Sequence, residues 1–158
     1  MRTAAELVSS LGLTEHPEGG WYREVHRAQE ILQTPRGPRA ALTSIYYLLE
    51  AGQVSRWHVV DSDEVWHFHE GAPLELLTYE PRSRALTRRV LGSPADGHEP
   101  IGAVRAGEWQ AARSQGAWTL VGCDVGPGFD FADFRFVTEL PAHAAHFEDA
   151  LREYSTLR

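Results

Sequence analysis

The residues best suited to do chemistry lie in one stretch near the middle of the chain. His58 and Glu64 are six positions apart, at the end of one strand-like segment and the start of the next. A turn through residues 61–63 would bring them side by side on adjacent strands. An imidazole and a carboxylate that face one pocket can move protons, or they can hold a divalent metal ion. His58 and Glu64 are therefore the candidate catalytic residues.

The composition excludes several other kinds of chemistry. All 15 basic residues are arginine, so a Schiff-base lysine and the lysine of a P-loop are both excluded. Cys123 is the only cysteine, which excludes an intramolecular disulfide and a cysteine-rich zinc site. Its apolar neighbours predict a buried thiol. The formal net charge of −7 argues against a nucleic-acid partner, which would need a basic surface.

The hydropathy pattern predicts no membrane partner. No apolar run approaches the ~18 residues of a membrane-spanning helix, and the N-terminus lacks the apolar core of a signal peptide. We therefore expect a cytoplasmic protein whose ligand is a small molecule. A chain of 158 residues suits a single domain, 1–158.

The elements that must position His58 and Glu64 are mostly strands. Thr3 and Glu6 have the spacing of a capping box and Gly12 is a stop signal, which predicts a helix over residues 4–11. Ten strand-sized segments follow, separated by turns rich in Gly and Pro, and they predict an all-β sandwich or barrel. These segments are Trp21–Arg27, Leu42–Leu49, Val54–Val60, Glu64–His69, Leu74–Glu80, Ala85–Leu91, Ala103–Arg105, Glu108–Ala112, Trp118–Val125 and Phe131–Thr138.

Two regions between and after these strands are expected to differ. Residues 28–41 and 92–101 are expected to be loops that shape the pocket. Apolar residues at helical spacing after Pro141 predict a C-terminal helix over about 142–155. His143 and His146 fall on that helix, and we interpret them as surface residues. The Phe129–Phe136 segment has no purely apolar face, which indicates an edge strand or one covered by the C-terminal helix.

The stretch that holds His58 resembles the first motif of the cupin superfamily. Gly52, His58, Glu64 and Gly71 stand at the motif positions, and Val60 replaces its second histidine. The resemblance implies a double-stranded β-helix, the cupin jelly-roll barrel, which often binds a divalent metal through three histidines and one glutamate. Valine cannot coordinate a metal.

The second cupin motif aligns with residues 105–110, where Gly107 is kept. Gln110 occupies the position of the metal-binding histidine, and an amide oxygen is a weaker ligand than imidazole. The resemblance therefore implies His58, Glu64 and Gln110 as the ligands of one divalent metal ion, and it leaves open whether a metal binds.

Longer blocks resemble one small single-domain cupin subfamily, a domain of unknown function. This resemblance covers residues 11–136 and implies a core barrel over about 20–138, a homodimer and a likeness to sugar epimerases and isomerases. The blocks are residues 16–24, 43–49, 61–69, 107–110, 118–123 and 127–134.

Several side chains are candidates for binding the substrate. By strand parity Trp66 and Phe68 share the face of Glu64, so we expect them in the pocket. His67 and His69 then belong to the outer face or a dimer interface. Arg23 follows a glycine turn and could bind an anionic group, and Tyr46 is an aromatic candidate for stacking. Gln110 completes this set.

Three functions from different classes fit these residues. The first is an isomerase or epimerase acting on a sugar or another small polar metabolite through His58 and Glu64. The second is a non-catalytic ligand-binding cupin with an eroded metal site. The third is a metal-dependent oxygenase, which the weak ligand set disfavours.

Overall fold

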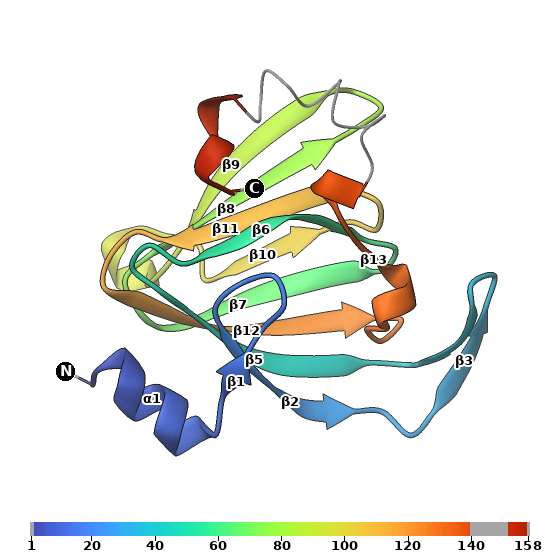
Figure 1. The fold of residues 1–158 in the computed structure, drawn as a ribbon, viewed down its shortest axis with the longest axis horizontal. Helices are drawn as coiled ribbons and strands as arrows, with labels where there is room; N and C mark the ends of the chain where they lie inside the picture. The colour runs from blue at the N-terminus through green and yellow to red at the C-terminus, as the bar shows by residue number, and fades with distance from the viewer. Residues whose placement is uncertain (1, 140–151, 158) are drawn as a thin grey trace.

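The computed structural model describes residues 2–139 and 152–157. Within these ranges the chain is mostly β, with one N-terminal α-helix, α1 (Ala4–Leu11). Two antiparallel sheets lie one above the other (Figure 1). The six-stranded sheet has the order β1 (Thr14–Glu15), β2 (Trp21–Arg27), β5 (Thr43–Glu50), β12 (Trp118–Gly126), β7 (Asp63–Gly71) and β10 (Ile101–Val104).

The second sheet has five strands, and a small hairpin projects beside the two sheets (Figure 1). The five-stranded sheet has the order β13 (Phe134–Phe136), β6 (Val54–Val60), β11 (Trp109–Ser114), β8 (Leu74–Glu80) and β9 (Ala85–Leu91). The hairpin pairs β3 (Ile31–Thr34) with β4 (Gly37–Ala40). Short 3-10 helices are η1 (Pro94–Asp96), η2 (Phe131–Asp133), η3 (Val137–Glu139) and η4 (Ser155–Leu157).

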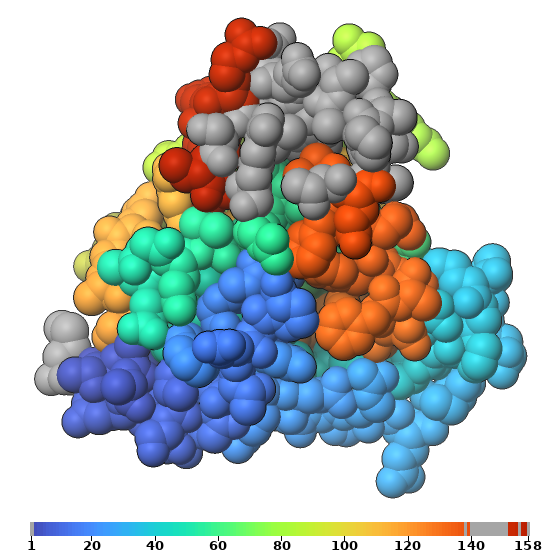
Figure 2. All heavy atoms as spheres, viewed as in Figure 1, coloured from blue at the N-terminus to red at the C-terminus, as the bar shows by residue number. Residues whose placement is uncertain are grey.

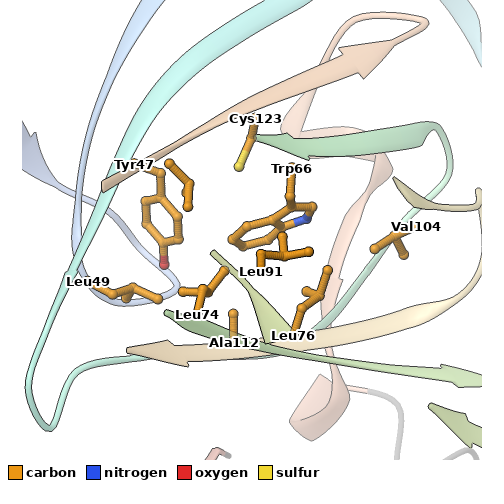
Figure 3. Close-up of a cluster of buried hydrophobic side chains, with 10 residues drawn as sticks. Tyr47, Leu49, Trp66, Leu74, Leu76, Leu91, Val104, Ala112 and Cys123 are labelled. Atoms are coloured by element: carbon orange, nitrogen blue, oxygen red, sulfur yellow. The ribbon is translucent and has the colours of Figure 1, made fainter. Parts of the chain in front are cut away.

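The main core lies between the two sheets. Tyr47, Trp66 and Cys123 of the six-stranded sheet point toward Leu74 and Leu76 of the other sheet (Figure 3). Each of these side chains is almost fully buried, and the rings of Tyr47 and Trp66 meet edge to face at 5.9 Å. Their removal from water is the principal force that holds the sheets together.

The outer faces of both sheets are covered as well. Leu7 of α1 packs on Leu48 and Leu120 of the six-stranded sheet. Leu157 packs with Trp57 and Leu77 on the outer face of the five-stranded sheet. Because strands in both sheets are buried on two faces, their sequences read as continuous apolar runs rather than strict alternation.

Most of the expected elements are confirmed. The helix over 4–11 has a capping box between Thr3 and Glu6, and it ends at Gly12 in the left-handed conformation. The segments Trp21–Arg27, Val54–Val60, Leu74–Glu80 and Ala85–Leu91 are strands with the expected bounds. The jelly-roll-like arrangement of strands agrees with the predicted class of fold.

Two expectations about local structure were wrong. Residues 28–41 contain the β3–β4 hairpin, which Arg36 and Arg39 anchor by hydrogen bonds to Ser62 and Asp133 far away in the sequence. Residues 131–138 are not one strand: the Asp130 carboxylate accepts a hydrogen bond from Ala132 N and starts η2. The β13 strand that follows has three residues and forms an edge of its sheet, as expected for this segment.

The predicted C-terminal helix over 142–155 is not shown, because residues 140–151 lie outside the described ranges. His143 and His146 lie outside them too. The described segment 152–157 includes the 3-10 helix η4, in which Leu157 is fully buried. Among residues 2–139 and 152–157, no helix is long and apolar enough to cross a membrane.

Candidate acid-base site

A pocket of about 340 Å³ opens between the two sheets and contains both candidate catalytic residues. His58 enters it from β6 of the five-stranded sheet, and Glu64 enters it from β7 of the six-stranded sheet. The expectation that they lie on adjacent strands was therefore wrong. The chain crosses from one sheet to the other between residues 60 and 63, so the two side chains reach the pocket from opposite walls.

His58 is held in one orientation by its own strand. Its side chain is 2% exposed, and its Nδ1 lies 2.6 Å from the carbonyl oxygen of Arg56. Because a carbonyl can only accept, Nδ1 must carry a proton. The other nitrogen, Nε2, lies 3.3 Å from Oε2 of Glu18. The Glu18 carboxyl group therefore lies beside the one ring nitrogen of His58 that the backbone does not engage.

Glu18 reaches the pocket from the tight loop that joins β1 to β2. His16 N donates to Gly20 O at 2.9 Å and Gly19 N donates to His16 O at 3.0 Å, which closes the loop. At Gly19 φ is 110°, and a Cβ there would lie 2.1 Å from the carbonyl oxygen of Val54, so only glycine fits. The loop thus packs directly on β6 and buries Glu18, whose Oε1 accepts a hydrogen bond from Ser55.

Glu64 is a buried carboxyl group that titrates near neutrality. Burial raises its pKa to about 7, and the charge of Glu18 adds to this effect. His58 and the hydrogen bond from Gln110 act in the opposite direction without cancelling it. A carboxyl group with this pKa can both give and take a proton at physiological pH.

Gln110 joins Glu64 to the core. It lies opposite His58 in the β11–β6 pairing, and its Nε2 donates to Glu64 Oε2 at 2.5 Å. Its Oε1 accepts a hydrogen bond from Trp66 Nε1 at 2.9 Å. Because an indole nitrogen is only a donor, this contact fixes the orientation of the amide. Gln110 therefore presents its amino group, not its oxygen, to the carboxylate.

This arrangement does not fit the implied metal ligand set of His58, Glu64 and Gln110. The Gln110 oxygen points to Trp66, and the lone pair that His58 Nε2 would give to a metal faces Glu18 instead. Within residues 2–139 and 152–157, no group of three His, Cys, Asp or Glu side chains is arranged to hold a metal ion.

His16 contributes a second imidazole to the pocket. Its Nδ1 accepts a hydrogen bond from Glu18 N at 3.1 Å, which leaves Nε2 to carry the proton of the neutral ring. Burial lowers the pKa of His16, and the nearby His58 lowers it further, while the charge of Glu18 opposes both. The ring packs edge to face on Tyr22 at 4.5 Å. His16 is therefore an uncharged hydrogen-bond donor at neutral pH.

Three phenylalanines form one wall of the pocket, which we call the phenylalanine wall: Phe129, Phe131 and Phe134. Their rings meet edge to face, at 5.0 Å for Phe129 and Phe131. Phe134 also stacks on the ring of His58 at 5.1 Å. The segment that carries this wall and the loop that carries Glu18 lie next to each other on one face of the molecule, coloured orange and blue in Figure 2.

Contacts distant in sequence hold the phenylalanine wall in place. Phe129 N donates to Thr43 Oγ1 at 2.8 Å. On the other side of η2, Arg39 binds both carboxylate oxygens of Asp133 at 2.8 Å, and the Arg39 hydrogen bond lowers the pKa of Asp133. The wall is thus connected to β5 and to the β3–β4 hairpin.

The other predicted binding residues do not line the pocket. Trp66 shares the inner face with Glu64, as parity predicted, but it is 1% exposed and belongs to the core, where Phe68 packs against its cluster. Arg23 and Tyr46 lie on the outer face of the six-stranded sheet, with the guanidinium 5.6 Å from the ring centre.

His67 and His69 lie on the outer face, as expected. His67 Nε2 is 3.0 Å from Asp124 Oδ2, and the ring of His69 packs near Tyr46. Cys123 is buried, as expected, and its pKa is raised well above the usual range by that burial.

Sequence reasoning missed His16, Glu18 and the phenylalanine wall. The loop residues lie in the block of residues 16–24, in which sequence reasoning singled out only Arg23, after the glycines at 19 and 20. Two glycines after a histidine and a glutamate are a signal that the backbone is tightly packed there. No local signal shows that Glu18 reaches His58, because the contact spans forty positions of sequence.

Comparison with known proteins agrees with this fold. The profile of a family described as Cupin superfamily (DUF985) matches residues 5–137. The crystal structure of a protein from Shewanella oneidensis is 34% identical, with a TM-score of 0.87 over 99% of this chain and 98% of that chain. A hypothetical protein from Leishmania major is 29% identical, with a TM-score of 0.81 over 94% and 98% of the two chains.

A more distant likeness concerns the fold alone. Oxalate decarboxylase from Bacillus subtilis is 17% identical, with a TM-score of 0.63 over 91% of this chain and 36% of that chain. Among curated proteins no significant match was found.

Proposed function

Since this chain belongs to the cupin superfamily family DUF985, we propose that its pocket binds a small molecule and catalyses a proton transfer within it. The observation that carries this proposal is Glu64, a buried carboxyl group with a pKa raised to about 7. It shares the pocket with His58, which reaches it from the opposite sheet. Perturbed titratable groups of this kind concentrate at functional sites.

The two groups have complementary roles. Because burial raises the pKa of Glu64 to about 7, this carboxyl group can take a proton from a carbon or oxygen atom of the substrate and release it again. His58, whose Nε2 faces Glu18, can give a proton to the same or a neighbouring atom of the substrate. One proton leaves the substrate and one is added, so no oxidant or second substrate is needed. Isomerases and epimerases use this chemistry.

Other pocket residues position the substrate. His16 donates a hydrogen bond from Nε2, and the phenylalanine wall excludes water from one side. A volume of about 340 Å³ is at the small end of ligand pockets, which suits a metabolite of one ring or a short chain. Gln110 acts through Glu64 as a positioning residue.

Proton exchange tests this function directly. The purified protein is incubated in D₂O with a panel of aldoses, ketoses and unsaturated carbonyl compounds, and NMR follows the replacement of carbon-bound hydrogen by deuterium. We expect exchange at one position of at least one compound, and we expect Glu64→Gln and His58→Asn each to slow it by about 10²–10⁴-fold.

Matched controls separate the site from the rest of the molecule. Glu99→Gln and His98→Asn change the same residue types outside the pocket and should leave the exchange rate unchanged. Equal rates in Glu64→Gln, His58→Asn and the unaltered protein would disprove the roles assigned here.

A non-catalytic binding module is the second candidate, favoured by Val60, which lines the pocket where the cupin motif has a histidine. Native mass spectrometry of gently purified protein would detect a retained ligand, a metal and the oligomeric state together. A retained compound that shows no deuterium exchange would support this candidate. The expected homodimer would appear as twice the mass of the chain.

A further inference from the structure

More acidic than basic side chains line the pocket. Among the described residues that line it, four are carboxylates, namely Glu18, Glu24, Glu64 and Asp130, and one guanidinium is present, that of Arg27. A site built for a carboxylate or phosphate needs a cation or several backbone N–H groups that are free to bind it. Whether Arg27 is free therefore decides which ligands fit.

Arg27 is already engaged at the rim. Its Nε and Nη2 donate to the two carboxylate oxygens of Glu24 at 2.9 and 2.8 Å. Nη1 and Nη2 also donate to the carbonyl oxygen of Phe129 at 3.3 and 3.2 Å. An anion that approached Arg27 would meet a guanidinium already paired with the Glu24 carboxylate, which would repel it.

The imidazoles do not supply a free positive charge either. His58 Nε2 faces Glu18, so any charge on the ring is balanced by that carboxylate. Burial lowers the pKa of His16 and keeps its ring neutral. Arg36, Arg39 and Arg135 bind Asp61 or Asp133 and are not among the residues that line the pocket.

Most of the remaining lining of the pocket is apolar. The phenylalanine wall presents three aromatic rings, and Phe131 is 58% exposed although it borders a buried site. Ile45, Val60 and Val125 line the pocket from the strands. Such walls gain energy from burying a flat apolar body, and aromatic rings also attract organic cations.

From this arrangement we infer that the substrate carries no anionic group. It is an uncharged or positively charged small organic molecule whose apolar body lies against Phe129, Phe131 and Phe134. Its polar end faces His58, Glu64 and His16. This inference rests on the proposed function for the use of the pocket, and it selects against sugar phosphates and dicarboxylates as substrates.

Three probes with the same ring test the inference. At neutral pH benzylamine is cationic, benzyl alcohol is uncharged and benzoate is anionic. Calorimetry or saturation-transfer NMR would compare their binding to the full-length protein. We expect benzylamine and benzyl alcohol to bind, and benzoate to bind at least about tenfold more weakly than benzylamine. Benzoate binding as tightly as benzylamine would overturn the inference, as would failure of all three to bind at millimolar concentration.

Variants test whether the preference among the three probes arises in the pocket. Phe131→Ala should weaken benzylamine and benzyl alcohol by similar factors. Glu64→Gln should reduce the advantage of benzylamine over benzyl alcohol, whereas Glu99→Gln, outside the pocket, should not. If Glu64→Gln still bound benzylamine more tightly than benzyl alcohol by the same factor, the ammonium group would lie away from Glu64, and the inferred placement of the ligand would be wrong.

The unaltered protein provides an independent measurement. Raising the pH from 6 to 8 ionises Glu64, so it should strengthen benzylamine binding and leave benzyl alcohol binding unchanged. A benzylamine affinity that does not rise over this range would contradict the inference. The two proposals can fail separately. If no compound exchanged deuterium but the charge preference held, only the proposed proton transfer would be wrong. If an anionic compound exchanged deuterium, only the inferred substrate class would be wrong.

Discussion

His58 Nε2 lies 3.3 Å from Glu18 Oε2, with the two side chains 2% and 8% exposed. Since His58 Nδ1 is engaged by the carbonyl of Arg56, Nε2 is the ring nitrogen left to contact Glu18. Ser55 binds the other oxygen of Glu18 and fixes the carboxylate toward the ring. The pair thus places an imidazole and a carboxyl group side by side in the pocket that also contains Glu64.

Replacing Glu18 with glutamine should separate proton transfer from folding. The amide can still accept from Ser55 and can donate to His58 Nε2, so the packing is kept while the carboxyl group is lost. We expect deuterium exchange to slow by about 10²–10⁴-fold, and the urea-unfolding free energy to change by less than about 1 kcal/mol. If Glu18→Gln lowered the free energy of unfolding by more than the free-energy equivalent of the slower exchange, Glu18 would have a structural role.

Replacing Glu64 with glutamine should alter how stability depends on pH. The folded-state pKa of about 7 exceeds the ordinary value of 4.5, so the folded protein binds the proton more tightly than the unfolded chain. The stability linked to Glu64 is complete below pH 4.5 and is lost as the pH rises through about 7. At higher pH the unaltered protein is therefore penalised by about 3 kcal/mol relative to Glu64→Gln.

Urea unfolding at several pH values measures this difference. Glu64→Gln keeps an oxygen that accepts from Gln110, so the two proteins should be closely similar near pH 4.5 and diverge in favour of the variant by pH 8. Parallel curves across this range would show that Glu64 titrates normally. The rate of deuterium exchange in the unaltered protein should also change across pH 7.

The hydrogen bond from Trp66 to Gln110 should be visible in a double-mutant cycle. Trp66→Phe leaves the buried Gln110 oxygen without its donor, which costs about 1–3 kcal/mol in addition to the loss of packing. Gln110→Leu removes both polar groups of that side chain. A coupling energy near zero between the two substitutions would contradict the role of Trp66 in orienting the amide.

Removal of divalent metal should leave the proton transfer intact. The Gln110 oxygen and His58 Nε2, two of the three ligands that the cupin motifs imply, are turned to Trp66 and Glu18. We expect dialysis against EDTA to change neither the melting temperature nor the rate of deuterium exchange. Stoichiometric metal by elemental analysis, with activity lost on chelation and regained on adding the metal, would show that these side chains rearrange around an ion.

The amino-acid sequence by itself determined the class of fold, and it predicted that His58 and Glu64 face one pocket, which both of them line. Local signals were sufficient for α1, whose capping box lies within four residues, and for strands such as Val54–Val60 that lie between turns. The β3–β4 hairpin and η2 were missed because their stability depends on distant partners, above all the Arg39–Asp133 ion pair. Contacts of this kind have no signature in a short window of sequence.

The tertiary structure alone decided which side chains meet in the pocket. Parity correctly placed Trp66 on the inner face, but only the packing of two sheets decided that it belongs to the core and not to the pocket. Gln110 was expected as a metal ligand, and its contact with the indole of Trp66 determines instead that its amino group faces Glu64. Glu18 and the phenylalanine wall belong to the site because folding brings together residues that are far apart in the sequence. Glu18 precedes His58 by 40 positions and Phe134 by 116 positions. Sequence sets the chemistry that each residue can do, and burial in the folded chain decides which of that chemistry is used.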